Sequence, residues 1–197
     1  MGLAVARGRL ALATRHAITL FAKAPLLAPD LLPKERGRYD SLFLPRATYH
    51  TGDVNVHDVA FADDGLWFVN STFSCLSALS KDFSFVPRWQ PPFISEIVPE
   101  DRCNLNGLAV TDGKPKYVTA LGASDVVGGW RENKASGGIV IDVASGRDRS
   151  SHRQCCRHVR IHFGLYRDLR CSVFARRSTR EYFEYRGRGH SSGIYGP

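Results

Sequence analysis

Three segments of this chain share one pattern of small and apolar residues, and this internal repeat constrains the fold more than any other feature. In each, a small or turn-forming residue precedes an apolar residue, an Ala and a second apolar residue, and a glycine follows within a few positions. The segments are residues 1–5, 57–61 and 106–110, and the glycines are Gly8, Gly65 and Gly113. A glycine that can take a positive φ suits a tight hairpin turn. Each segment therefore predicts a strand, a glycine turn and a second strand.

Further apolar runs extend each unit into a meander. We expect strands over residues 10–14, 66–70, 74–79, 83–89 and 116–121, and a buried-strand run over residues 137–146 that is closed by an Asp and a turn. The repeat spacing is 56 residues from Gly2 to Asp58 and 49 from Asp58 to Gly107, and periods of about 40 to 50 residues are typical of propeller blades. We predict an all-β fold, a partial β-propeller of about two to two and a half four-stranded blades. A sandwich of unrelated hairpins, which also repeats glycine turns, remains the alternative.

A propeller normally closes about four to eight blades into a ring, so that no sheet edge stays open. The units found here are too few to close one. We therefore expect the chain to be a truncated piece of a longer protein. Open sheet edges predict poor solubility for such a piece.

The charge of the chain lies entirely at one end. Residues 1–146 contain 15 basic and 15 acidic side chains, whereas residues 147–197 contain 12 Arg, no Lys and 4 acids, which accounts for the net charge of +8. The predicted strand pattern also stops at Gly146. We predict an incomplete propeller-like domain over residues 1–146 and an irregular, Arg-rich tail over residues 147–197. We expect this tail to be disordered or to result from a frameshift.

Several strings in the first 146 residues resemble a family of uncharacterised bacterial proteins. Among them are residues 65–70 (Gly-Leu-Trp-Phe-Val-Asn), 99–109 (Pro-Glu-Asp-Arg-Cys-Asn-Leu-Asn-Gly-Leu-Ala) and 128–134 (Gly-Gly-Trp-Arg-Glu-Asn-Lys). The family consists of conserved hypothetical proteins with a domain of unknown function. The resemblance implies a propeller-like fold that continues into further blades, and it implies no established reaction.

Candidate site residues cluster where the repeated strands begin, because the loops at that end of a propeller open on the funnel that binds ligands. The predicted ligand-binding residues are His57, Asp58, Asn70, Arg102, Asn104 and Asn106. Asp and Asn oxygens that converge from different blades suit a hard cation such as Ca²⁺. Asn and Asp also recur at strand ends simply for turn chemistry. Trp130 and Arg131 lie in a Gly-rich loop and are two further residues that could contact a ligand.

No catalytic signature is present, so we lean towards a non-enzymatic propeller that binds an unknown small molecule or protein. The first alternative is a metal-assisted hydrolase of the lactonase type, an analogy at the level of architecture alone. The second is nucleic-acid binding through the basic tail, which we expect to be non-specific. No apolar run approaches the roughly 20 residues of a membrane helix. We therefore expect no membrane partner and a cytoplasmic location.

Overall fold

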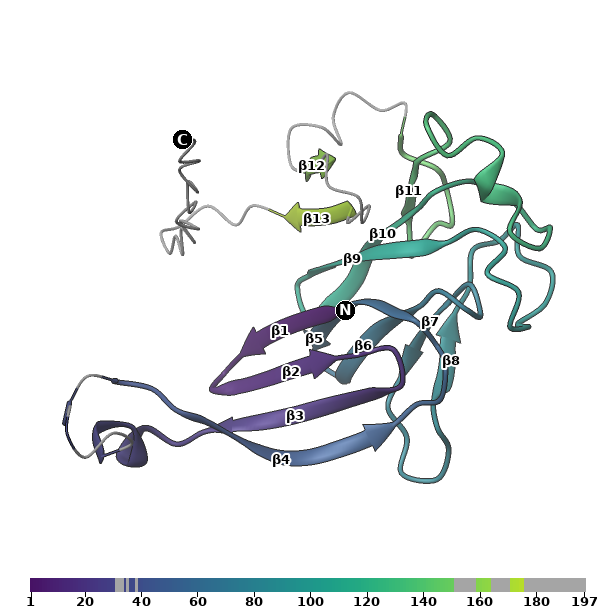
Figure 1. Ribbon diagram of the computed structural model, residues 1–197. Helices are drawn as coiled ribbons and strands as arrows, with labels where there is room; N and C mark the ends of the chain where they lie inside the picture. The colour runs from purple at the N-terminus through teal and green to yellow at the C-terminus, as the bar shows by residue number, and fades with distance from the viewer. Residues whose placement is uncertain (31–33, 35, 38, 151–158, 164–170, 176–197) are drawn as a thin grey trace, which may run out of the picture.

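The computed structural model describes residues 1–30, 34, 36–37, 39–150, 159–163 and 171–175. Its strands form three antiparallel sheets, which we name A, B and C, and a separate two-stranded hairpin (Figure 1). The prediction of an all-β fold is confirmed. The described sheets do not close into a ring. No helix in the described part of the chain is long and apolar enough to cross a membrane.

Each sheet is a meander whose strands pair in chain order. Sheet A consists of β1 (Gly2–Ala6), β2 (Arg9–Ala13), β3 (Ala17–Lys23) and β4 (Phe43–His50). Sheet B consists of β5 (Val56–Ala62), β6 (Gly65–Asn70), β7 (Cys75–Ala78) and β8 (Val86–Trp89). Sheet C consists of β9 (Leu105–Thr111), β10 (Lys114–Ala120) and β11 (Ile139–Asp142). The hairpin is formed by β12 (Val159–Phe163) and β13 (Cys171–Ala175).

The predicted glycine turns are found between the first two strands of every sheet. Gly8, Gly65 and Gly113 take φ angles of 72°, 131° and 71°. These values lie in the region that side chains with a Cβ rarely adopt. The turns therefore form where the repeat predicted them, and they set the register of β1 with β2, β5 with β6 and β9 with β10.

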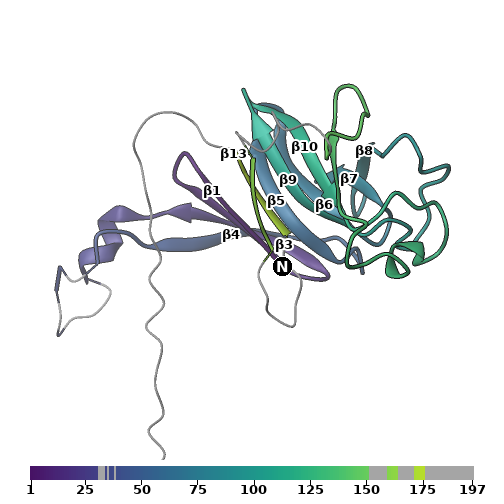
Figure 2. The ribbon, with the colours of Figure 1, turned by 90° about the horizontal axis from the view of Figure 1, so that it is seen from above.

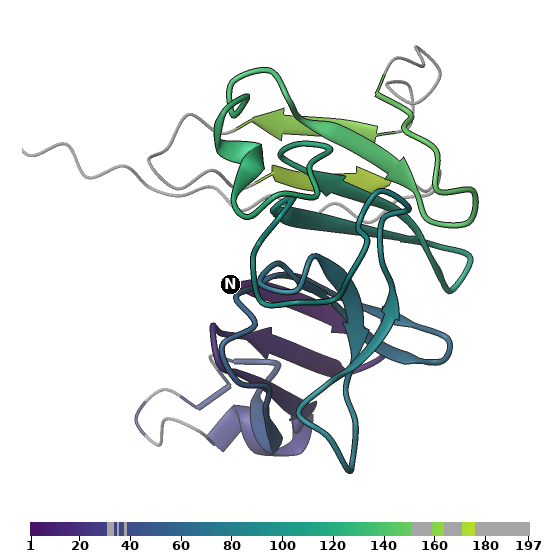
Figure 3. The same ribbon diagram turned by 90° about the vertical axis from the view of Figure 1, so that its right-hand side faces the viewer.

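The sheets follow one another in chain order, from purple sheet A to green sheet C (Figure 3). Their first strands lie side by side, with β1 next to β5 and β5 next to β9. Gly2 permits the first of these approaches, since a Cβ placed there would lie 3.0 Å from the backbone of Asp58 and from a methyl group of Val59. Any larger side chain at Gly2 would push β1 away from β5.

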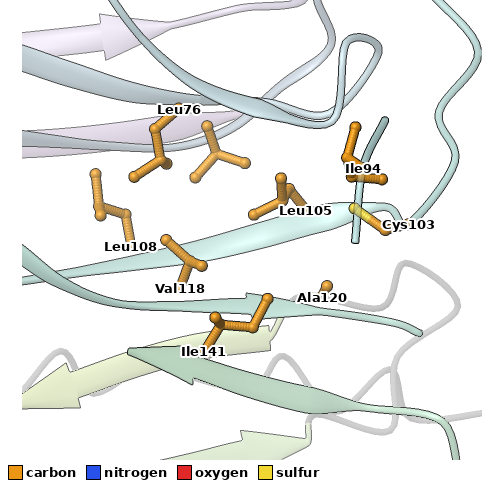
Figure 4. Packing of buried hydrophobic residues seen from close by; sticks show 9 residues of the cluster. Leu76, Ile94, Cys103, Leu105, Leu108, Val118, Ala120 and Ile141 are labelled. Atoms are coloured by element: carbon orange, nitrogen blue, oxygen red, sulfur yellow. The ribbon is translucent and has the colours of Figure 1, made fainter. Parts of the chain in front are cut away.

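Two apolar cores join the three sheets. The core between sheets A and B contains Ala11, Ala13, Ile18, Val54, Val56, Val59, Leu66 and Phe68. The core between sheets B and C contains Val69, Leu76, Ile94, Cys103, Leu105, Leu108, Val118, Ala120 and Ile141 (Figure 4). Sheet B is thus covered on both faces, which is why β7 is buried along its whole length.

Within the described residues, the 3₁₀ helices η1 (Pro25–Asp30) and η3 (Gly129–Arg131) lie in the long connections. Helix η1 belongs to the β3–β4 connection and lies away from the sheets (Figure 2). Helix η3 belongs to the β10–β11 loop.

The strand predicted over residues 83–89 is shorter than expected, because β8 begins only at Val86. The Ser80 hydroxyl accepts hydrogen bonds from the backbone N–H groups of Asp82 and Phe83, at 3.1 Å each. This turn extends through Phe83, which is an exposed residue. A serine-capped turn therefore replaces the first positions of the predicted strand.

The backbone continues to pair beyond Gly146, where Ile141 and Asp148 form an isolated bridge. The Asp142 N–H donates to the Arg147 carbonyl at 3.0 Å, and the Arg149 N–H donates to the Val140 carbonyl at 2.7 Å. A turn at residues 143–146 thus returns the chain along β11. The domain boundary at Gly146 stays a prediction, but it falls inside a paired turn.

Most of the predicted tail, including residues 151–158 and 176–197, lies outside the described residues. The exception is the β12–β13 hairpin, in which Val159 pairs with Ala175 and Phe163 with Cys171. The sequence alternates between apolar and polar residues from Val159 to Phe163. Such a period of two favours a strand, and a prediction of a wholly irregular tail does not account for it.

Asp142, a buried carboxylate, closes sheet C with an ion pair to the half-exposed Lys116. Its Oδ2 accepts from the Lys116 Nζ at 2.8 Å, and its Oδ1 accepts from the Ser145 N–H and hydroxyl at 2.9 Å each. Burial alone would raise the pKa of Asp142, but the hydrogen bonds from Lys116 and Ser145 outweigh it and lower the pKa to about 2.

We predict that Asp142→Asn removes a stabilising contribution that depends on pH. A lowered pKa means that the contribution is present above the unfolded-state value of about 3.9 and is lost as the pH falls towards about 2. The wild-type protein should lose on the order of 1 to 2 kcal/mol more than the variant between pH 5 and pH 2, since the half-exposed Lys116 weakens the pair. Urea unfolding at a series of pH values would measure this, and parallel pH profiles would contradict it.

Candidate functional site

The loops that precede β5 and β9 and those that follow β6 and β10 meet at one end of the stack, which we name the loop end. It comprises residues 51–55, 71–74, 90–104 and 121–138. The loops bond to one another: the Thr72 N–H donates to the Val54 carbonyl at 3.3 Å, and the Asp101 N–H donates to the Thr72 carbonyl at 2.9 Å. All six predicted site residues lie in these loops or in the strand residues next to them.

His57 and Asn106 meet across two sheets. The His57 Nδ1 lies 3.2 Å from the Asn106 Nδ2, and the His57 Nε2 lies 3.1 Å from the Asn55 Nδ2. An amide nitrogen donates, and which ring nitrogen of His57 accepts depends on the tautomer of the imidazole. His57 and Asn106 occupy the same position in their repeats, and this equivalence explains why the side chains converge.

Asp58 holds β5 to β9. Its Oδ2 accepts from the Leu108 N–H at 2.8 Å, and its Oδ1 accepts from the Val59 N–H at 2.9 Å. Burial raises the pKa of Asp58, and the two N–H groups partly oppose that shift. The sequence predicted Asp58 as a ligand-binding residue, and the structure places both of its oxygens on backbone groups.

The side chains of Asn70 and Asn104 also form hydrogen bonds with residues close to them in the chain. The Asn70 Oδ1 accepts from the Phe73 N–H at 3.1 Å, and its Nδ2 lies 3.4 Å from the Ser77 hydroxyl. The Asn104 Nδ2 donates to the two Asp101 oxygens at 3.1 and 3.3 Å. Asn104 takes a φ of 47°, a conformation that Asn tolerates better than most residues.

Arg102 ties two of the loops together. Its Nε donates to Glu100 at 2.7 Å, and its Nη1 donates to Asp125 at 2.9 Å and to the Ser95 hydroxyl at 3.0 Å. The side chain is largely buried. Two carboxylates compensate its charge, and hydrogen bonding from Ser95 and Arg102 lowers the pKa of Asp125. The structure thus gives Arg102 a role in positioning the β10–β11 loop.

A pocket of about 410 Å³ lies within the β10–β11 loop, and polar side chains of Ser124, Asp125, Glu132 and Asn133 line it together with Trp130. The Trp130 Nε1 donates to the Asp101 carbonyl at 3.0 Å and to its carboxylate at 3.2 Å. The Arg131 guanidinium lies 4.5 Å from the centre of the Trp130 ring. The Gly-rich loop that carries Trp130 and Arg131 therefore lines an open pocket, of which Trp130 is a lining residue and Arg131 is not.

The pocket and the His57–Asn106 pair are linked but separate. Asp101 bonds to Trp130 of the pocket and to Asn104, which is two residues from Asn106. His57 and Asn106 do not line the pocket. Among the described residues, no group of three or more His, Cys, Asp or Glu side chains could hold a metal ion.

Sequence reasoning missed three residues that organise the loop end: Asn55, Asp101 and Asp125. Asn55 and Asp101 take φ angles of 48° and 47°. The residue types of Asn55 and Asp101 were a sequence signal, since Asn and Asp are among the non-glycine residues that most often take a positive φ. Asp125 carried no such signal, because its partner Arg102 is distant in the sequence.

In a comparison with protein families, a domain of unknown function (DUF4915) matches residues 1–152. The match extends six residues beyond the predicted boundary at Gly146, over the turn that returns along β11. No curated protein and no solved structure matches the chain.

Proposed function

We propose that this chain, which belongs to the family of domains of unknown function DUF4915, is a non-enzymatic protein that binds a small polar ligand at its loop end. The arrangement of its sheets supports a propeller-like architecture. Three meanders stack face to face with β1, β5 and β9 adjacent, as the innermost strands of neighbouring blades do. Free thiols at Cys75 and Cys103 support a cytoplasmic setting.

The observation that carries the binding proposal is the contact between His57 and Asn106 at 3.2 Å. These two polar side chains come from different sheets and occupy equivalent repeat positions. An apolar pair at these positions would contribute to packing alone. Asp58, Asn70, Arg102 and Asn104 hold backbone and loops in place around them. In this proposal His57 and Asn106 contact the ligand, and the other four residues position them.

The chemistry of the pair favours an uncharged ligand with hydroxyl or amide groups. An imidazole and an amide carry no fixed charge in their neutral forms, and both ring nitrogens of His57 face amide groups, those of Asn55 and Asn106. The one charged predicted residue on the neighbouring loop, Arg102, is neutralised by Glu100 and Asp125. A polyol, a sugar or a small amide matches this set of groups.

The experiment is a thermal-shift screen of the full chain against polyols, monosaccharides and small amides. A ligand at one hundred times its Kd should stabilise the protein by about 2.7 kcal/mol. Titration calorimetry on each hit then compares the wild type with His57→Phe and Asn106→Ala. Each variant should bind about 10-fold more weakly, since each removes one hydrogen-bonding group.

Asn133→Ala is the matched control, because Asn133 is an exposed amide that lines the separate pocket. It should leave the affinity unchanged. A screen without any hit, or a hit whose affinity falls only with Asn133→Ala, would refute the proposed site. Circular dichroism would verify that the variants keep their strands.

A further inference from the structure

The pocket of the β10–β11 loop has no part in the proposed function, and a single segment of the chain forms it. Every described residue that lines it lies between Gly122 and Gly137. Its shape therefore depends on this loop and on the residues that support the loop. The volume of about 410 Å³ falls within the range of about 300 to 1,000 Å³ that is typical of small-molecule sites.

Glycines form part of the pocket wall where the backbone leaves no room for a side chain. A Cβ at Gly137 would lie 2.9 Å from the carbonyl oxygens of Leu121 and Asn133. A Cβ at Gly129 would overlap the Ser124 hydroxyl. The loop therefore folds closely on itself at these positions, which only glycine permits.

Contacts from the neighbouring loop hold two of the lining residues in place. The Asp125 Oδ1 accepts from the Arg102 Nη1 at 2.9 Å and from the Ser95 N–H at 3.1 Å. The Trp130 Nε1 donates to the Asp101 carbonyl at 3.0 Å. A site whose walls are fixed before binding loses less conformational freedom when a ligand enters. These anchors therefore favour the pocket as a binding site.

The ionisable side chains that line the pocket are carboxylates. Asp125 and Glu132 line it, and none of the described lining residues is Lys, Arg or His. Arg102 offsets the charge of Asp125 only in part, because it also forms an ion pair with Glu100. Glu132 is exposed. The lining is therefore negatively charged, and it favours a ligand with a positive charge.

Two cations of the same loop lie near the pocket without lining it. The Arg131 guanidinium is 4.5 Å from the centre of the Trp130 ring, and the Lys134 ammonium is 5.8 Å from it. Neither residue lines the pocket. The ring already has cationic partners from its own chain, so the carboxylates are the groups that would hold the cation of a ligand.

We propose that this pocket binds a small primary amine that also carries a hydroxyl or amide group. The ammonium donates to Asp125 and Glu132, since an ammonium has only donors and a carboxylate only acceptors. Ser124 and Asn133 line the pocket and bond to the second polar group of the ligand. Val126, which is 69% exposed at the pocket, contacts its carbon chain.

The donor set does not favour a metal ion. In the part of the chain that the structure describes, no group of three or more His, Cys, Asp or Glu side chains could hold one. A hard cation such as Ca²⁺ takes about six to eight oxygen ligands. An ammonium has three N–H donors and is satisfied by fewer acceptors.

Titration calorimetry of the full chain tests the proposal with two pairs of compounds. Ethanolamine is compared with ethylene glycol, and aminobutanol with butanediol, up to about 10 mM so that millimolar Kd values are detected. Within each pair the ammonium is exchanged for a hydroxyl on the same carbon chain. The wild type should bind each amine at least about 10-fold more tightly than its diol, because charge-assisted hydrogen bonds are about twice as strong as neutral ones.

Two substitutions remove the proposed acceptor charges while keeping the shape of the side chains. Glu132→Gln should weaken amine binding by about 3-fold, as expected of an exposed ion pair. Asp125→Asn should weaken it by about 10-fold, since Asp125 is less exposed. Glu96→Gln is the matched control, because Glu96 is an exposed carboxylate of the neighbouring loop that does not line the pocket. It should bind the amines as the wild type does, and so should His57→Phe.

Equal affinities for amines and diols, or no binding of either amine, would overturn the proposal. Amine binding that persists unchanged in both pocket variants would overturn it too. A loss of equal size in Glu96→Gln would indicate attraction to the whole surface, and a loss in His57→Phe would place the amine at the other site. Circular dichroism would verify folding, because Asp125→Asn takes a charged partner from Arg102. If that variant does not fold, the exposed Glu132→Gln decides the test alone.

Discussion

Replacing Asp58 with Ala should lower the free energy of unfolding by about 2 kcal/mol or more at pH 7. The substitution leaves the N–H groups of Val59 and Leu108 without their acceptors, at a cost of about 1 to 3 kcal/mol for each buried donor. Relief from burying a carboxylate offsets part of that loss. Urea unfolding followed by circular dichroism would measure the difference.

The loss at Asp58 should also depend on pH, in the direction opposite to that of Asp142. Burial raises the folded-state pKa of Asp58, so its contribution is fully present below the unfolded-state pKa and declines as the pH rises through the folded one. The difference between wild type and Asp58→Ala should therefore be larger near pH 4 than at pH 7. A difference that increases with pH would show that the carboxylate is stabilised in its charged form.

Asp82→Ala is the control for Asp58→Ala. Asp82 is an exposed residue in the turn before β8, and the Ser80 hydroxyl accepts from its backbone N–H, which the substitution keeps. Its effect should stay within about 0.5 kcal/mol. Equal losses from the two variants would mean that Asp58 does not join β5 to β9.

Phe68→Ala should cost about 3 to 5 kcal/mol, which is the range for deleting a buried aromatic side chain. Phe68 is fully buried between sheets A and B. Loss of its ring leaves a cavity next to Ile18 and Val59, and the backbone pairing of β6 with β5 and β7 limits how far the site can collapse. The folded fraction at 37 °C should fall visibly.

Phe83→Ala provides the same chemical change without burial. Phe83 is 71% exposed in the turn that precedes β8, so its removal should change stability by less than about 0.5 kcal/mol. The two variants are compared by thermal and urea unfolding. If Phe68→Ala proved as stable as Phe83→Ala, sheets A and B would not be packed on one another as described.

The strand units were predictable because their signals are local. Gly8, Gly65 and Gly113 mark turns whose positive φ a glycine accepts without strain. The same repeat also placed His57 and Asn106 at equivalent positions, and the structure brings them to 3.2 Å of each other. Register between adjacent strands follows from the turn, so short-range information sufficed for these features.

The roles of most other predicted site residues were not predictable. Arg102, predicted as a ligand-binding residue, has partners at Glu100 and Asp125. Asp58, chosen as a ligand, bonds to a backbone group fifty positions later in the chain. The residue type determines which groups a side chain can bond to. Its actual partner depends on which loops lie beside that side chain in the folded protein.

The sequence by itself determined that this chain builds repeated antiparallel meanders with a neutral body and a basic end. Turn glycines, the alternation of apolar and polar residues, and charge are all local features of the sequence. Only the tertiary structure decided which face of each sheet is covered. Leu3, Val59 and Leu108 are chemically alike in the repeat, yet Leu3 is exposed and the others are buried. Burial of a side chain depends on what packs against it in space. A repeat pattern in the sequence does not say which sheet packs against each repeated unit.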